Sequence, residues 1–98
     1  MMDKKYNLPL IYSEIPINEK KYVRKQYMEE QNYKCMFCHE DILKPAPDFI
    51  TKLKIDWGLF PPNFLKYPIH LQHSHDTGLT EGVVHNYCNA VMWQYENK

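Results

Sequence analysis

The last third of the sequence gathers residue types that bind metal ions and transfer protons. Four of the five histidines lie there together with the third cysteine: His70, His73, His75, His85 and Cys88. The other two cysteines, Cys35 and Cys38, lie far upstream. Thiolates and imidazoles are preferred ligands of zinc. An ion held jointly by these two parts of the chain would fold the whole middle of the sequence around the last third.

The spacing of these ligands favours a closed metal site. Cys35 and Cys38 form a Cys-x-x-Cys turn, and His85 and Cys88 repeat the gap of two residues. Together they make a Cys3His set, which fills a tetrahedral zinc shell without an open catalytic position. Two alternatives stay open: a redox pair, which would need a surrounding βαβ pattern that we do not find, and three unrelated buried thiols. His39 follows Cys38 directly, so we expect it at the surface or behind the ligands.

Composition limits the class of protein. Ninety-eight residues make one domain, and a domain this small benefits from an added staple such as a metal. Net charge is zero, with 12 basic and 12 acidic residues, which argues against a chain that coats nucleic acid through bulk charge. We find neither a signal peptide nor an apolar stretch long enough for a membrane span. The odd cysteine count argues against a disulfide framework, so we expect an intracellular protein.

The elements that would position these residues begin with an arm and a helix. Residues 1–17 contain Pro9 and Pro16 and are expected to form an extended arm. A helix is predicted over 18–31, with Asn18 as its N-cap. Val23 and Tyr27 are one helical turn apart and would form its apolar face.

The same predicted helix carries the one dense basic cluster, Lys20, Lys21, Arg24 and Lys25. These four side chains are candidates for contacts with DNA phosphates. The plain alternative is a solvated helix face, which explains most charge runs of this kind.

The segment 40–68 is broken by five prolines and gives the weakest pattern. Short strands are predicted at 49–50 and 53–57, and a helical turn at 63–67. Its aromatic residues are Trp57, Phe60, Phe64 and Tyr67. We expect an ordered loop whose aromatic side chains fill the core, in preference to a surface that meets a ligand.

The end of the chain predicts a hairpin followed by a helix. Residues 69–74 suit a strand, the sequence from Asp76 to Gly78 is a turn signal, and 80–84 can return as a second strand. A helix then begins near Asn86 and runs to about Tyr95. Cys88 would lie in its first turn, where the helix dipole favours a thiolate.

With these motifs in place, the sequence resembles the HNH, or His-Me finger, endonucleases, and within them the branch of recombination endonuclease VII. That family pattern is Cys-x-x-Cys, then a His-Leu-Asp-His-x-His strand, a Thr-Gly turn, Arg-Gly, and Cys-x-x-Cys-Asn at the head of a helix. The resemblance covers 35–38 and 70–93, and the helix over 18–31 is similar, whereas 40–68 matches nothing in the family. The matching residues of the second part are His70, His73, His75, Thr77, Gly78, Gly82, His85, Cys88 and Asn89.

The resemblance implies a role for each matching residue. Cys35, Cys38, His85 and Cys88 would hold a structural Zn²⁺, with His85 at a position where the family usually has cysteine.

In the same way, the resemblance makes His73 the general base, with His70 and His75 contacting the scissile phosphate or orienting that base. Asn89, together with Gln72, would hold a catalytic Mg²⁺ or Mn²⁺.

Two positions depart from the family pattern. Gln72 stands where the family has a metal-binding aspartate, and a neutral amide is a weaker ligand for a hard cation than a carboxylate. Glu81 stands where the family often has arginine, so one expected phosphate contact is lost. Asp76 is the nearest carboxylate and a possible substitute ligand, although it lies beyond the strand. Other His-Me finger nucleases are similar in holding their ion through asparagine and water.

Taken together, the sequence predicts an α+β fold: a small zinc-stapled ββα-metal domain over 35–98 with an N-terminal helix and an inserted loop at 40–68. The function that the resemblance implies is a divalent-metal-dependent DNA endonuclease, a phosphodiester hydrolase leaving 5′-phosphate and 3′-hydroxyl ends, alone or as a homodimer. The expected location is the cytoplasm or nucleoid of a host, and a phage or virus is one source that the resemblance suggests. Two alternatives stay open: a non-catalytic zinc-bound module for nucleic-acid or protein binding, and a structural zinc domain docked to a larger partner.

Overall fold

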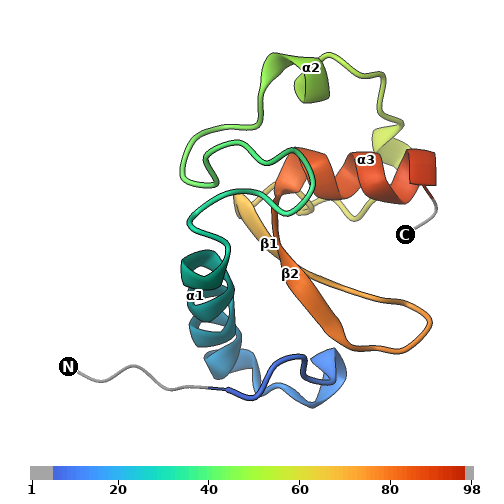
Figure 1. Cartoon of the computed structure of the whole chain (residues 1–98). Helices are drawn as coiled ribbons and strands as arrows, with labels where there is room; N and C mark the ends of the chain where they lie inside the picture. The colour runs from blue at the N-terminus through green and yellow to red at the C-terminus, as the bar shows by residue number, and fades with distance from the viewer. Residues whose placement is uncertain (1–5, 97–98) are drawn as a thin grey trace.

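A computed structural model of the chain describes residues 6–96 and shows a small α+β fold built around one two-stranded antiparallel sheet (Figure 1). The elements are α1 (Lys20–Glu30), α2 (Asp48–Thr51), β1 (Ile69–His73), β2 (Thr80–His85) and α3 (Asn86–Glu96), with 3-10 turns at Tyr12–Glu14, Ile17–Glu19 and Trp57–Leu59. Helices α1 and α3 both pack against the hairpin, and α2 lies against α3. Among the described residues, no helix is long and apolar enough to cross a membrane.

The hairpin and the helix that follows it confirm the sequence prediction for 69–96. Ile69 pairs with His85 at one end, and Gly78 takes a φ of 78° in the turn, a left-handed conformation that glycine adopts without strain. Gln72 pairs with Gly82 but His73 pairs with Thr80, so β2 carries one extra residue in a β-bulge. β2 then runs straight into α3 without a connecting loop.

Helix α1 is also confirmed, although it begins differently than expected. Val23 and Tyr27 are buried as predicted, and the Tyr27 hydroxyl lies 2.7 Å from the Thr80 hydroxyl on β2. The prediction of Asn18 as N-cap is wrong. Asn18 lies inside the 3-10 turn Ile17–Glu19, which leads into α1 without a side-chain cap.

The predicted N-terminal arm is not a free extension. Over its described part, the Leu10 amide donates to the Thr80 hydroxyl at 2.9 Å, and the Tyr12 amide donates to the Gly78 carbonyl at 2.8 Å. Residues 1–5 of the predicted arm lie outside the described residues. The described arm is therefore held at two places, to Gln26 of α1 through the Tyr6 main chain and to the hairpin through Leu10 and Tyr12.

The strands predicted in 40–68 are wrong. Residues 49–50 lie in α2, which starts after Pro47, and 53–57 form no strand because no neighbouring strand lies within reach to pair with them. Residues 63–67 form turns without becoming a helix. The segment is nevertheless ordered, since the Asp56 amide donates to Gln94 Oε1 of α3 at 2.8 Å.

Core filling by the aromatic residues of this segment is only partly right. The buried side chains that 40–68 contributes to the core are Ile42 and Ile50. Trp57 is 40% exposed and Tyr67 is 62% exposed. The aliphatic residues therefore anchor the loop, and two of its large aromatic rings stay at the surface.

One close contact ties α1 to β2 and requires glycine. The Gln31 side chain acts as an extra strand partner, accepting from the Val83 amide at 2.9 Å and donating to the Val83 carbonyl at 3.1 Å. A Cβ at Gly82 would lie 2.5 Å from Gln31 Oε1 and 2.9 Å from Met36 Sδ. No real pair of atoms of these types approaches so closely, so any side chain at this position displaces Gln31.

We therefore expect Gly82→Ala to lower the free energy of unfolding by about 1–3 kcal/mol, the usual cost of overpacking. Urea unfolding followed by circular dichroism measures this loss. In a Gln31→Ala background the same substitution should cost less, because the closer of the two atoms that the new Cβ meets is gone and only Met36 Sδ remains. Additive losses in the double variant would show that this contact is not the cause.

Candidate functional site

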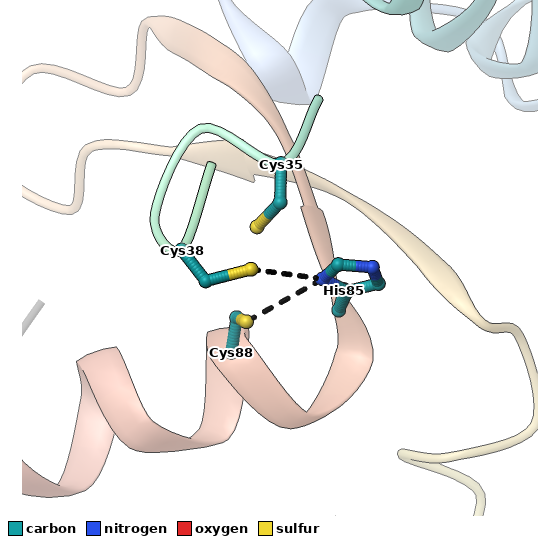
Figure 2. Close-up of side chains that lie close together, drawn as sticks. All are labelled: Cys35, Cys38, His85 and Cys88. Atoms are coloured by element: carbon teal, nitrogen blue, oxygen red, sulfur yellow. Dashed lines mark hydrogen bonds between the residues drawn. The ribbon is translucent and has the colours of Figure 1, made fainter. Parts of the chain in front are cut away.

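Four potential metal ligands meet at the junction of three segments (Figure 2). Cys35 and Cys38 come from the loop after α1, His85 from the last residue of β2, and Cys88 from the first turn of α3. Their ligand atoms all lie within 4.8 Å of one another. The expected grouping of these four residues is confirmed, and the cluster can hold a metal ion such as zinc.

The histidine of this cluster is oriented by a backbone group. His85 Nε2 lies 2.9 Å from the carbonyl oxygen of Asp41, an arrangement in which Nε2 carries the proton and donates it. Nδ1 is then unprotonated, and it lies 3.4 Å from Cys38 Sγ and 3.6 Å from Cys88 Sγ. Metal-bound histidines commonly have their second nitrogen held by a carbonyl in this way. This partner could not be predicted from the sequence, because Asp41 contributes only its main-chain carbonyl.

A tight turn shapes the Cys-x-x-Cys segment. The Cys35 amide donates to the Glu40 carbonyl at 2.8 Å, and the His39 amide donates to the Cys35 carbonyl at 2.9 Å. The Phe37 amide points at Cys35 Sγ from 3.4 Å, a contact that stabilises a thiolate. His39 takes a φ of 66° and is exposed, as expected, so it closes the turn without joining the ligands.

The crowded thiols compete for protons. A hydrogen bond from the Cys88 thiol lowers the pKa of Cys35 to about 4, and the same contact raises the pKa of Cys88. Burial raises the pKa of Cys38. A divalent cation among the three sulfurs would replace these protons and favour all three thiolates, so the donor set fits zinc.

A second group of residues lines a cleft of about 480 Å³ along β1. Most of the residues singled out from the sequence for catalysis, cation binding or DNA contact line it: Lys20, Arg24, His70, Gln72, His73, His75 and Asn89. Lys21 and Lys25 are exposed on α1 and are not part of the lining. Asp76 is exposed in the hairpin turn and does not reach the cleft, so the idea that it substitutes as a ligand gains no support.

Asn89 offers a free acceptor in this cleft. Its Nδ2 lies 3.0 Å from His70 Nδ1, and its buried Oδ1 has no hydrogen-bond partner among the described residues. Burial lowers the pKa of His70, so the ring is neutral at neutral pH and Nδ1 can accept from the Asn89 amide. This bond uses the Asn89 nitrogen and leaves its carbonyl oxygen unpaired within the described part of the chain. A buried, unpaired oxygen of this kind suits a hard cation.

His73 lies between two other rings. The Tyr12 ring stacks on it at 4.1 Å between centroids, and the His75 ring stacks at 4.8 Å, both 13° from parallel. Burial and then the charge of His75 lower the pKa of His73, while the Glu81 carboxylate opposes them. Among the described residues no hydrogen bond engages the His73 ring nitrogens, so either can meet a water molecule or a substrate.

Gln72 and Glu81, the two departures from the family pattern, lie beside each other. Gln72 is 3% exposed, and its Nε2 donates to the His73 carbonyl at 3.0 Å and lies 3.5 Å from Glu81 Oε1. Glu81 is the extra residue of the β-bulge, which explains how its side chain reaches back toward Gln72. The sequence showed both residues, but not the bulge that brings them together.

The structure also brings in aromatic residues that the sequence did not associate with the cleft. Tyr12 from the arm and Trp93 from α3 line it, and Trp93 meets the His75 ring edge-on at 4.0 Å.

Comparison with family models, with curated proteins and with solved structures found no match.

We expect purified protein to contain one zinc ion per chain, measured by native mass spectrometry. Cys88→Ser should lose the zinc and unfold, because the ion supplies much of the folding free energy of so small a domain. His39→Asn is the matched control, since Asn tolerates a positive φ and His39 is not a ligand. A well-folded, zinc-free Cys88→Ser protein would contradict the Cys3His site.

Proposed function

We propose that this protein is a Mg²⁺- or Mn²⁺-dependent DNA endonuclease of the HNH type, a ββα-metal domain stapled by zinc. It hydrolyses a phosphodiester bond and leaves 5′-phosphate and 3′-hydroxyl ends. The observation that carries the proposal is the cleft along β1. It combines an accessible imidazole on His73, the unpaired buried oxygen of Asn89, and the cationic side chains of Lys20 and Arg24. A base, a cation ligand and phosphate-binding charges are what phosphodiester hydrolysis needs.

His73 is the group that takes the proton from the attacking water. Its lowered pKa keeps the imidazole neutral at neutral pH, and only the neutral ring can accept a proton. The stacked rings of Tyr12 and His75 hold the plane of the His73 ring in place, and His73 lines the cleft. A fixed, neutral imidazole needs no reorganisation before it acts.

Asn89 and Gln72 would hold the catalytic cation through their amide oxygens. When bound, that ion relieves charge on the phosphate and stabilises the departing 3′ oxygen. His70 supports this site indirectly, since its bond to Asn89 Nδ2 directs the Asn89 oxygen away from itself. Lys20 and Arg24 on α1 face the same cleft from the other side and would position the phosphate.

The Cys3His cluster would give this cleft its rigidity. Cys88 directly precedes Asn89 on α3, and His85 ends the strand that pairs with β1. One zinc ion held there would fix the start of α3 against the hairpin, and with it the Asn89 side chain against His70. The structural metal and the hydrolytic site are therefore separate in role but mechanically linked.

A second candidate is a non-catalytic zinc-bound module that binds nucleic acid or a protein. The specific observation in its favour is Gln72, which puts a neutral amide where a hard cation prefers a carboxylate. The net charge of zero also means that general electrostatic attraction to DNA is weak, which agrees better with a binding module than with a nuclease.

We expect the zinc-loaded protein to nick supercoiled plasmid with Mg²⁺ or Mn²⁺. His73→Ala should slow nicking by at least about a hundredfold while zinc content and thermal stability survive, because it removes only the base. His39→Asn is the matched control: it removes a histidine that does not line the cleft, so this variant should nick at the wild-type rate.

No nicking with any divalent cation, in protein that still holds zinc, would favour the binding module. A salt-sensitive gel shift would then identify nucleic acid as its ligand, and the absence of any shift would indicate a protein partner. Equal rates for His73→Ala and wild type would show that another group is the base.

The pH dependence of nicking tests His73 separately. The rate should rise as His73 loses its proton, with a midpoint below the ordinary histidine pKa of 6.5. Glu81→Gln removes a negative charge that raises this pKa, so the midpoint should move to lower pH. His75→Gln removes a positive charge that lowers it, so the midpoint should move to higher pH. A midpoint that stays fixed in both variants would mean that His73 is not the titrating group.

A further inference from the structure

The cleft along β1 is bordered by aromatic rings as well as by charges. Tyr12, Tyr67 and Trp93 line it, together with three histidine rings. Tyr67 is 62% exposed, and no other ring stacks on it among the described residues. Several other large apolar side chains of this protein are equally exposed, Phe49 among them at 61%, so what distinguishes Tyr67 is that its exposed ring lines the cleft.

The Tyr67 ring is exposed but not loosely attached. The Asn86 side chain donates to the Tyr67 carbonyl at 3.1 Å, and the Asn86 amide donates to the Pro68 carbonyl at 2.9 Å. Asn86 is the first residue of α3, so the main chain at Tyr67 is fixed to the helix that also carries Asn89. A fixed backbone below an exposed ring is pre-organised for a flat ligand.

Lysine side chains accompany the rings at this cleft. Lys66 Nζ lies 5.5 Å from the centroid of the Tyr67 ring, and Lys20 Nζ lies 4.4 Å from that of Tyr12. The Tyr12 ring already stacks on His73, whereas no ring stacks on Tyr67 among the described residues. A nucleotide has a flat base and an anionic phosphate, so the exposed ring of Tyr67 with the charge of Lys66 matches one nucleotide unit.

The size of the cleft and the charge of the protein favour unpaired nucleotides. A volume of about 480 Å³ lies in the range of small-ligand sites, so the cleft can admit a single unpaired base. With no net charge, the protein gains little from general attraction to a duplex. Stacking does not depend on net charge, and it requires a base whose face is free.

We infer that the cleft takes its DNA as an unpaired strand, with one base stacked on Tyr67 and the neighbouring phosphate near Lys66. This inference deepens the proposed function and rests on it, because the strand would be the substrate of the same site. Unpaired nucleotides of this kind occur in single strands and in flaps.

The test measures binding by fluorescence anisotropy in zinc-loaded His73→Ala protein with Mg²⁺, where the strand is not cut. The probes are a labelled single strand and the duplex of the same sequence, at physiological ionic strength. We expect tighter binding of the single strand. Tyr67→Leu should weaken it by about tenfold, the effect of losing one stacked base, while Tyr67→Phe keeps the ring and the affinity.

Tyr22→Leu is the matched control. Tyr22 is also exposed, and Lys21 Nζ lies 5.2 Å from the centroid of its ring, but Tyr22 does not line the cleft. Its loss should leave single-strand binding unchanged. Equal effects of Tyr22→Leu and Tyr67→Leu would overturn the assignment of the stacking ring to Tyr67.

The other outcomes separate this inference from the proposed function. If wild-type protein nicks DNA but binds the duplex as tightly as the single strand, with Tyr67→Leu unchanged, the inference is overturned and the nuclease stands. If folded, zinc-loaded protein neither binds either probe nor nicks plasmid, both fall, and the exposed rings belong to a contact with another protein.

Discussion

The fold depends on the meeting of four ligands from three segments that are far apart in the sequence. Cys35 and Cys38 close a turn, His85 ends β2, and Cys88 opens α3, and all four ligand atoms lie within 4.8 Å of one another. Without a partner for these thiols, the cluster would be a group of buried sulfurs competing for protons. With a metal ion, the same cluster would help to fix the angle at which α3 leaves the hairpin, in addition to the core packing of Val91 and Met92.

The angle matters because Cys88 and Asn89 are consecutive residues on α3. Moving the first turn of the helix by a fraction of its pitch would carry Asn89 away from His70 and break the 3.0 Å contact between them. The bond from His85 to the Asp41 carbonyl extends this control to the loop that begins the segment 40–68. The Cys3His cluster and the cleft share no residue, and the start of α3 is the element that connects them.

The features that could be predicted from the sequence depend on local patterns, whereas those that were missed depend on distant parts of the chain. The hairpin, α3 and the Cys3His group follow from local signals: alternation in 69–74, a glycine turn, and two equal ligand gaps. The strands predicted near Phe49 and Leu53 failed because β-propensity needs a neighbouring strand, and none lies there. Tyr12 and Tyr67 could not be placed at the cleft from sequence, since they reach it only through the path of the arm and of the long loop.

The β-bulge changes how the two unusual residues of the hairpin should be understood. Taken as separate positions, Gln72 removes a negative charge and Glu81 replaces an expected positive one. In the structure they are neighbours, with Glu81 Oε1 3.5 Å from Gln72 Nε2. The carboxylate missing at position 72 is thus present one side chain away, where it also raises the pKa of His73 against the effect of burial. Glu81 itself is exposed and does not line the cleft, so it acts there through its contact with Gln72 and its charge on His73. The two substitutions therefore have to be tested as a pair.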